Sequence, residues 1–251
     1  VKIAKDAAFA EQLAKVFKKG KFQLYLQFDG VQEAGQRALR GADLRDLRAQ
    51  CLERCGEAEI PVTLAMTVTP ANLDFLWETV AAGLGQRHVR GVSFQPEFRS
   101  GRGEGEKRRL NTADIILNVV EQSRGALRFE DFTPLPCGDP NCATIGYLLR
   151  TPAGVRSISD FVDFASVQGF LQDRVRYSLE DLAQCGCESE PLGQILKQFE
   201  LDESHAFRLF IKPFMDAGTW DEDRIDRCCT HVIRPDGMLD SFCRYYSGFV
   251  Q

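Results

Sequence analysis

The run of residues 61–68 (PVTLAMTV) restricts the fold of this chain more than any other feature. A stretch with almost no polar break is typical of a strand that is buried on both faces, and such strands occur mainly in parallel sheets. Parallel strands need a long connection between them, usually a helix. Helical patterns flank the run, at residues 43–55 and 71–84. The segment therefore predicts a parallel sheet inside an α/β fold.

Two further strands continue the same alternation. Residues 24–29 and 89–95 have the composition of strands, and apolar residues recur at helical spacing over residues 6–19 and 112–123. The predicted order is one helix followed by three strand–helix units. This order indicates an α/β sheet with parallel strands in the first 125 residues.

The second half of the chain has a different pattern. Residues 132–147 (FTPLPCGDPNCATIGY) are rich in turn formers, with three prolines and two cysteines. Helical patterns return at residues 158–174, 191–199 and 203–215. Near the end, Pro235-Asp236-Gly237 is a turn signal between two short extended runs. These patterns predict a mostly α, cysteine-rich C-terminal domain over residues 126–251.

Three parallel strands make an incomplete sheet. Sheet edges expose unpaired N–H and C=O groups, and parallel edges are seldom left bare. The chain begins with Val1-Lys2-Ile3-Ala4, without a methionine, and enters a helix directly. We therefore expect further strands upstream, so that the chain is a fragment or one half of a split protein that pairs with a separate N-terminal half.

Composition and motifs exclude several functional classes. The net charge of -5 argues against a dedicated nucleic-acid binder. The mean hydropathy of -0.24 and the lack of an 18-residue apolar run argue against a membrane-spanning helix, and no leader peptide is visible, which indicates a cytoplasmic protein. The chain has no G-x-S-x-G, H-E-x-x-H or G-x-x-x-x-G-K-[ST] motif, and no G-x-G-x-x-G motif after a strand. Hydrolase, zinc-protease and nucleoside-triphosphatase functions therefore have no support.

Nine cysteines are unusual for such a chain, and without a secretion signal they are thiols or metal ligands rather than disulfides. Cys51 and Cys55 lie four residues apart on the apolar face of a predicted helix, so we interpret them as core packing. Their spacing matches the start of an iron–sulfur motif, but position 58 holds alanine. Cys185 and Cys187 form a lone C-x-C pair whose role stays undecided.

The other five cysteines are candidate metal ligands: Cys137, Cys142, Cys228, Cys229 and Cys243. The first two lie in a polar, proline-rich turn, and the turn at residues 235–237 is expected to fold the last one back toward the other two. Four thiolates from two separated segments are usual for structural zinc or for an iron–sulfur cluster, and buried reduced thiols are the alternative. His231 is a further candidate, as a ligand or as a donor to a cluster sulfur, whereas His88 and His205 are interpreted as structural.

Several segments, in this order, resemble the later half of a radical SAM barrel. Together they resemble the branch that contains archaeal tetraether-lipid synthases and related radical SAM methyltransferase-like proteins. The segments are YLQFDG (25–30), LRGADL (39–44), PVTL (61–64), VRGVSFQP (89–96), DFTPLPC (131–137), CCTH (228–231) and PDG (235–237).

The resemblance implies that residues 1–125 form part of a TIM-barrel-like (β/α)6 barrel and residues 126–251 an auxiliary metal-cluster domain. It also implies a [4Fe–4S] cluster and S-adenosylmethionine, whose cleavage yields a 5′-deoxyadenosyl radical that attacks a C–H bond of a small-molecule substrate or a lipid chain. Gln27, Asp29, Thr67 and Gln95 would contact the cofactor at the carboxyl ends of strands. The five candidate cysteines would hold the auxiliary cluster.

The chain also departs from this family. The C-x3-C-x2-C motif that holds the radical-generating cluster is absent, and so is the glycine-rich segment after the second barrel strand. As printed, the chain does not make the radical by itself. The alternative is a non-catalytic binding or scaffold module stapled by zinc or by an iron–sulfur cluster, or the subunit of a split protein.

Overall fold

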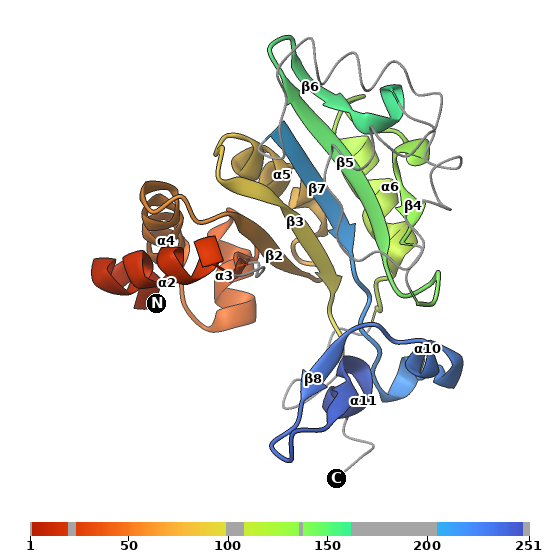
Figure 1. The fold of residues 1–251 in the computed structure, drawn as a ribbon. Helices are drawn as coiled ribbons and strands as arrows, with labels where there is room; N and C mark the ends of the chain where they lie inside the picture. Colours follow the sequence, from red (N-terminus) through yellow and green to blue (C-terminus); the bar gives the residue numbers. More distant parts are fainter. Residues whose placement is uncertain (1, 20–23, 99–107, 136–137, 162–204, 248–251) are drawn as a thin grey trace.

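The computed structural model describes residues 2–19, 24–98, 108–135, 138–161 and 205–247. Within these ranges the chain forms a seven-stranded sheet in the order β1-β2-β3-β7-β5-β4, in which β6 pairs with β5 at the side (Figure 1). Four neighbouring strands run parallel, and three strands at the other end of the sheet pair in the antiparallel sense. This mostly parallel α/β arrangement is compatible with part of a (β/α) barrel.

The strands come from both halves of the chain. The parallel ones are β1 (Leu24–Gln27), β2 (Val62–Val68), β3 (Val89–Pro96) and β7 (Ala206–Ile211). The antiparallel ones are β4 (Thr133–Pro134), β5 (Thr144–Thr151) and β6 (Gly154–Ser157), and a separate hairpin pairs β8 (His231–Ile233) with β9 (Leu239–Ser241). Strands on both sides of residue 125 thus belong to one sheet.

The helices follow the sequence pattern closely in the first half. They are α1 (Lys2–Lys5), α2 (Ala7–Lys19), α3 (Glu33–Arg40), α4 (Arg45–Glu57), α5 (Leu76–Leu84) and α6 (Thr112–Gln122), with the 3-10 turn η1 (Leu73–Phe75) before α5. Later elements are short: η2 (Phe129–Asp131), η3 (Ile158–Asp160), η5 (Ala217–Thr219), α10 (Glu222–Asp226) and α11 (Phe242–Ser247).

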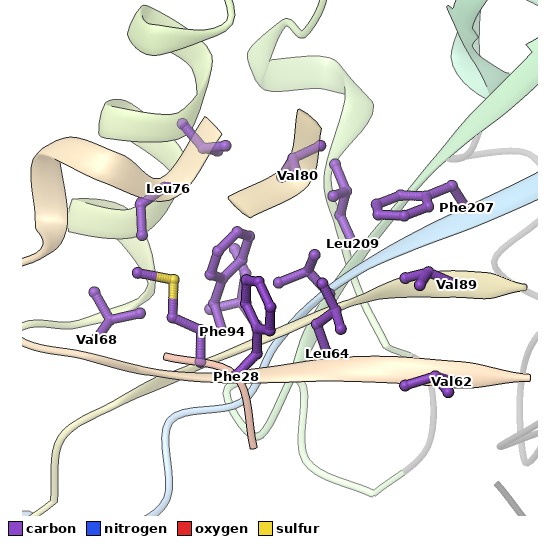
Figure 2. Close-up of a cluster of buried hydrophobic side chains, with 14 of the residues drawn as sticks. Phe28, Val62, Leu64, Val68, Leu76, Val80, Val89, Phe94, Phe207 and Leu209 are labelled. Atoms are coloured by element: carbon purple, nitrogen blue, oxygen red, sulfur yellow. The ribbon is translucent and has the colours of Figure 1, made fainter. Parts of the chain in front are cut away.

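One face of the sheet forms the main core. Side chains at alternate positions of β2, β3 and β7 point toward helix α5, as Figure 2 shows for Leu64, Phe94 and Leu209. Cys51 and Cys55 of α4 belong to the same cluster and are 3% and 0% exposed, which confirms that they are packing residues. Each large side chain buried in this way stabilises the fold by about 1.5–3 kcal/mol.

The opposite face of the sheet carries smaller and more polar residues, which we call the polar sheet face. Its members alternate with the core residues along the strands: Tyr25, Gln27, Thr63, Ala65, Thr67, Ser93 and Gln95. The strand registers place three of the four predicted cofactor contacts, Gln27, Thr67 and Gln95, on this face, and Asp29 follows the end of β1.

The prediction of a helix at residues 203–215 is wrong, because residues 206–211 form β7. The apolar residues Phe207, Leu209 and Ile211 are buried at every second position, while the residues between them are only partly buried. This alternation is the pattern of a strand. The segment is a strand because it fits between β3 and β5, which supply hydrogen bonds on both sides.

Helix α3 was not predicted, because it has no apolar stripe. Its buried residues are Gly35 and Gln36, and a buried glutamine gives no signal of helical periodicity. The helix ends at Gly41, whose φ of 71° is left-handed and therefore suits glycine.

The described part of the second half is not mostly α. It consists of six strands with short helices between them, and residues 162–204, where two helices were predicted, lie outside the described ranges. The predicted turn at residues 235–237 is confirmed: it joins β8 to β9, and Gly237 has a φ of +81°. In the residues that the structure describes, no helix has the length and apolar composition needed to cross a bilayer.

Candidate functional site at the carboxyl edge of the sheet

A network of hydrogen bonds lies where β1 and β2 end, and we call it the strand-end network: Gln27, Asp29, Gln36, Arg40, Arg48 and Thr67. Asp29 is its centre and is 1% exposed. One carboxylate oxygen accepts from Arg40 Nε at 2.7 Å and from Arg48 Nη2 at 2.9 Å. The other accepts from Gln27 Nε2 at 2.6 Å and from the Thr67 N–H at 3.0 Å. Both oxygens are therefore engaged by protein donors.

The charge on Asp29 is favoured by these donors. Burial raises the pKa of this carboxyl, but the hydrogen bonds from Arg40, the Thr67 N–H and Gln27 outweigh burial and hold the pKa below its ordinary value. Asp29 also has a left-handed backbone with φ of 58°, which is uncommon for a residue other than glycine. Such strained positions persist where the surroundings fix them. The carboxylate is thus an anion at neutral pH that orients two arginines.

Gln36 closes the network from helix α3. Its side-chain amide donates to the carbonyls of Phe28 and Gly30 at 2.7 and 2.8 Å, and its oxygen accepts from Arg48. The turn after β1 therefore has its backbone carbonyls satisfied by a buried side chain. This arrangement explains why a polar residue lies inside α3.

The structure brings together three of the four predicted cofactor contacts. Gln27 donates to Asp29 and, at 3.2 Å, to the hydroxyl of Thr67. Gln95 pairs with Thr67 in the β2–β3 register, and its amide donates to Ser93 at 3.4 Å rather than to the network. Gln27, Thr67 and Gln95 are half-buried, whereas Asp29 is fully buried. The three half-buried groups share the carboxyl edge of adjacent parallel strands.

Arg208 of β7 reaches over the polar sheet face. Its guanidinium donates to the Tyr25 hydroxyl at 2.9 Å, although β2 and β3 lie between the two strands. In the register, Thr63 and Gly91 occupy the intervening positions. A Cβ on Gly91 would lie 2.2 Å from the Arg208 carbonyl oxygen, so only glycine fits here. Small residues at these two intervening positions therefore leave room for the Arg208 side chain to reach Tyr25.

The two cysteine-bearing segments meet beyond the carboxyl ends of β3 and β7, where Figure 1 places the β8–β9 hairpin. Gly138 lies against residue 227: a Cβ on Gly138 would be 2.5 Å from the Arg227 carbonyl oxygen and 3.7 Å from the Cys229 sulfur. The Arg227 guanidinium also pairs with Asp139 at 2.9 Å. Backbone contact and an ion pair thus hold residues 138–142 next to residues 227–229.

A buried lysine contacts one of the candidate ligands. Lys212 follows β7, and its Nζ lies 2.7 Å from the Cys142 sulfur; the two residues are 6% and 5% exposed. A buried ammonium group needs a partner, and a thiolate is a suitable one. The contact places a positive charge among the cysteines, where thiolate ligands would accumulate negative charge.

Cys243 shares this environment. Burial raises the pKa of its thiol, and the charges of Cys142 and Cys228 add to the rise, while the Met215 N–H and Lys212 oppose it. The Met215 N–H donates to the Cys243 sulfur at 3.3 Å. Because β8 and β9 form a hairpin, Cys243 returns toward Cys228, as the turn signal indicated. Cys142 and Cys228 therefore lie near enough to Cys243 to raise the pKa of its thiol.

The described residues do not form a ready metal site by themselves. Among them, no group of three His, Cys, Asp or Glu side chains is arranged to hold a metal ion. Cys137, Cys185 and Cys187 lie outside the described residues. Cys229 packs against the small cluster of Leu135, Ala143 and Ile145, and His231 is exposed on β8. The assignment of the five ligands stays a prediction.

Sequence reasoning missed the arginines and the lysine of this edge. Arg40 and Arg48 come from helices, and charged helical residues usually face solvent, so their pattern gave no signal. Lys212 was assigned to a helix. Its position directly after the apolar alternation of residues 207–211 would have indicated a group at the carboxyl end of a strand.

Comparison of the sequence with known proteins finds one similar curated protein and no matching family model. The 7,8-dihydro-6-hydroxymethylpterin dimethyltransferase of Methanocaldococcus jannaschii is 25% identical over 296 aligned positions, which cover 93% of this chain and 57% of that protein. The chain thus spans a little over half the length of this curated relative. Nearly all of the chain is therefore similar to one part of a larger dimethyltransferase.

Proposed function

We propose that this chain is part of a radical SAM methyltransferase that acts on a small heterocyclic substrate. The observation that carries the proposal is the similarity of 93% of the chain to a protein named as a pterin dimethyltransferase. A mostly parallel α/β sheet with polar groups at its carboxyl edge is compatible with that function. The lipid substrate implied by the resemblance has no support from this relative, so we propose a heterocycle instead.

The residues that would hold S-adenosylmethionine are Gln27, Thr67 and Gln95. They are half-buried, uncharged donors and acceptors at the carboxyl ends of adjacent parallel strands, where ligands bind in folds of this kind. When bound to a reduced [4Fe–4S] cluster, S-adenosylmethionine supplies a radical or a methyl group. Asp29 would act as a positioning residue, because both of its oxygens already bind protein donors.

The cysteines would hold an auxiliary [4Fe–4S] cluster between residues 137–142 and 228–243. The chemistry of the donor set supports a thiolate centre, since Lys212 offsets negative charge at Cys142. The described residues hold no complete ligand set, so no reaction step is assigned to this cluster. Zinc in the same cysteines, without catalysis, is the competing assignment.

Metal analysis of the intact protein, purified without oxygen, tests the cluster. We expect iron and acid-labile sulfide in comparable amounts, together with the broad visible absorbance of an iron–sulfur cluster. One equivalent of zinc without sulfide would contradict the cluster and favour the scaffold function.

Cofactor binding tests the strand-edge assignment. Thr67→Val and Gln27→Ala each remove one polar group at the proposed site, and we expect each to weaken S-adenosylmethionine binding about tenfold, the usual effect of one lost hydrogen bond. Gln50→Ala is the matched control, because Gln50 is exposed on α4 away from this edge. Calorimetric titration measures the affinities, and equal binding by all variants would overturn the assignment.

A further inference from the structure

Lys212 and Cys142 form a buried amine–thiol pair at the carboxyl end of β7. The Lys212 Nζ lies 2.7 Å from the Cys142 sulfur, and the two residues are 6% and 5% exposed. In the same region, backbone N–H groups donate to the sulfurs of Cys243 and Cys228 at 3.3 and 3.4 Å. The amine–thiol contact is therefore clearly shorter than the N–H···S hydrogen bonds beside it.

The backbone fixes both partners. The Lys212 N–H donates to the Phe94 carbonyl at 2.9 Å, which continues the pairing of β7 with β3. The Cys142 N–H donates to the Asp139 carbonyl at 2.9 Å, and Asp139 is itself anchored by its ion pair with Arg227. Two reacting groups that are held in contact in this way react far faster than the same groups free in solution.

The pair also lies beside space that a small oxidant can occupy. A pocket of about 440 Å³ is lined by Asn141 and Thr144, which flank the segment that contains Cys142. Pro213, which directly follows Lys212, lines the same pocket. Dioxygen is small and uncharged, so it needs no polar anchor there. The amine and the thiol are thus shielded from bulk water but adjoin a cavity that admits dioxygen.

We propose that Lys212 and Cys142 form a reversible covalent cross-link on oxidation, in which one oxygen atom bridges the lysine nitrogen and the cysteine sulfur (N–O–S). An oxygen atom bonded to both groups spans about the distance at which they already lie. A direct sulfur–nitrogen bond, as in a sulfenamide, is shorter and requires the two groups to move closer together. The geometry therefore favours the oxygen bridge.

The reaction balances with dioxygen as the oxidant. One amine, one thiol and one dioxygen molecule give one N–O–S bridge and one water molecule. The N–O and O–S bonds form, one N–H bond, the S–H bond and the O–O bond break, and the two hydrogen atoms leave in the water. Nitrogen and sulfur each lose two electrons, and dioxygen gains all four. Two molecules of a dithiol return these electrons, restore the amine and the thiol, and release the bridging oxygen as water.

The cross-link and metal binding compete for the same sulfur. A cysteine binds metal as the thiolate, and a sulfur that is bonded to oxygen is no longer a thiolate. The link therefore forms only in molecules whose Cys142 is free of metal. It requires no particular metal, so it stands or falls independently of the proposed radical SAM function.

Mass spectrometry of the intact protein tests the cross-link. The protein is purified without oxygen, and one portion is then exposed to air together with a chelator that removes metal. We expect most air-exposed molecules to gain the mass of one oxygen atom less two hydrogen atoms, and to return to the original mass with dithiothreitol. Fragmentation of the digested protein should join residue 142 to residue 212.

Three variants show which atoms carry the link. Lys212→Arg keeps a positive charge beside the sulfur but lacks the primary amine, and Cys142→Ser lacks the sulfur, so neither should gain this mass. Cys243→Ser is the matched control, because Lys212 also lies near enough to Cys243 to lower the pKa of its thiol. This control should cross-link like the parent protein, and thermal unfolding shows that each variant is folded.

The mass change separates the possible outcomes. An air-exposed parent protein without the expected gain would overturn the proposal, and so would the same gain in Lys212→Arg. Loss of two hydrogen atoms alone would indicate a sulfenamide or a disulfide, and a gain of oxygen alone would indicate a simple sulfur acid. Either product in place of the bridge contradicts the N–O–S assignment.

Discussion

At the residue scale, Asp29 shows how one side chain can organise a sheet edge. It accepts hydrogen bonds from two arginines, a glutamine and a backbone N–H, and it does so in a strained backbone conformation. Arg48 is nearly as buried, with 6% of its surface exposed. The energetic importance of the pair lies in what remains after one partner is removed, namely a buried charge without its counter-ion.

Replacement of Asp29 by Asn is therefore expected to cost about 3–5 kcal/mol of unfolding free energy. The carboxyl has a lowered pKa in the folded state, so its stabilisation is present above the unfolded value of 3.8 and is lost as the pH falls through the folded value. The difference in unfolding free energy between the parent protein and the Asp29→Asn variant, measured by urea unfolding, should therefore become smaller below pH 3.8. Asp43→Asn is the control, since Asp43 pairs with Arg45 at the surface. A control that loses as much stability would show that burial is irrelevant.

His88 is a second buried titratable residue. Burial lowers its pKa, its ring lies against Gly56, and its Nε2 is buried without a partner among the described residues. A neutral folded imidazole stabilises the protein above the unfolded pKa of 6.5, and this stability is lost as the pH falls through the folded value. We expect His88→Gln to flatten the decline of the urea midpoint as the pH falls from neutral to below 6.5. If the urea midpoint of the parent protein and that of the His88→Gln variant fall equally steeply with pH, groups other than His88 cause the decline.

At the element scale, the cysteine-bearing segments are joined by backbone contact. Gly138 has a φ of +78° and no space for a Cβ beside residue 227, and the ion pair of Asp139 with Arg227 lies next to it. The hairpin of β8 and β9 then returns the chain to Cys243. The position of each sulfur therefore depends on how two loops dock rather than on a single motif.

Gly138→Ala is expected to separate these loops and to lower the metal content of the purified protein by at least half. Gly125→Ala is a matched control, because Gly125 has a similar φ of +94° but nothing within 4 Å of an added Cβ. Both variants place a side chain at a left-handed backbone position. A difference in metal content between them therefore comes from the clash of the added Cβ at residue 138 with the Arg227 carbonyl oxygen. Elemental analysis measures the metal, and equal metal content in the two variants would mean that loop docking does not control binding.

At the scale of the whole molecule, one sheet connects the two halves of the chain. β7 is inserted between β3 and β5, so residues after 205 complete a sheet that begins at residue 24. The main core lies on one face, while the proposed cofactor edge, the described candidate ligands Cys142, Cys228, Cys229 and Cys243, and a pocket lined by Glu97 and Arg224 lie at the carboxyl end of the parallel strands. Stability and binding are therefore supplied by different parts of one structure.

This separation predicts that ligand thiols and core thiols behave differently. Cys142→Ser should lower the metal content and increase hydrogen exchange in residues 227–243, because the proposed metal centre would no longer link the two cysteine-bearing loops. Cys51→Ser should leave the metal in place and lower the unfolding free energy, since Cys51 is buried against the main core. Metal analysis with exchange mass spectrometry checks both, and metal loss in both variants would contradict the sorting of the thiols.

Much of the first half was predictable because its signals are local. The predicted helices at residues 6–19, 43–55 and 112–123 and the strands at 61–68 and 89–95 agree with the structure within a few residues. Helix α3 and strand β7 were not predicted. In each case the segment takes its form from a partner elsewhere in the chain. Gln36 of α3 donates to the backbone carbonyls of the turn after β1, and residues 206–211 pair with a strand on each side.

The sequence by itself determined the parallel α/β character, the packing role of Cys51 and Cys55, and the hairpin turn near residue 236, because periodicity, burial preference and turn chemistry act over a few residues. Only the tertiary structure decided that Asp29 binds Arg40 and Arg48, that Lys212 meets Cys142, and that Arg224 lines a pocket with Glu97. Those contacts join residues distant along the chain. Their positions follow from strand register and loop docking, which no local pattern records.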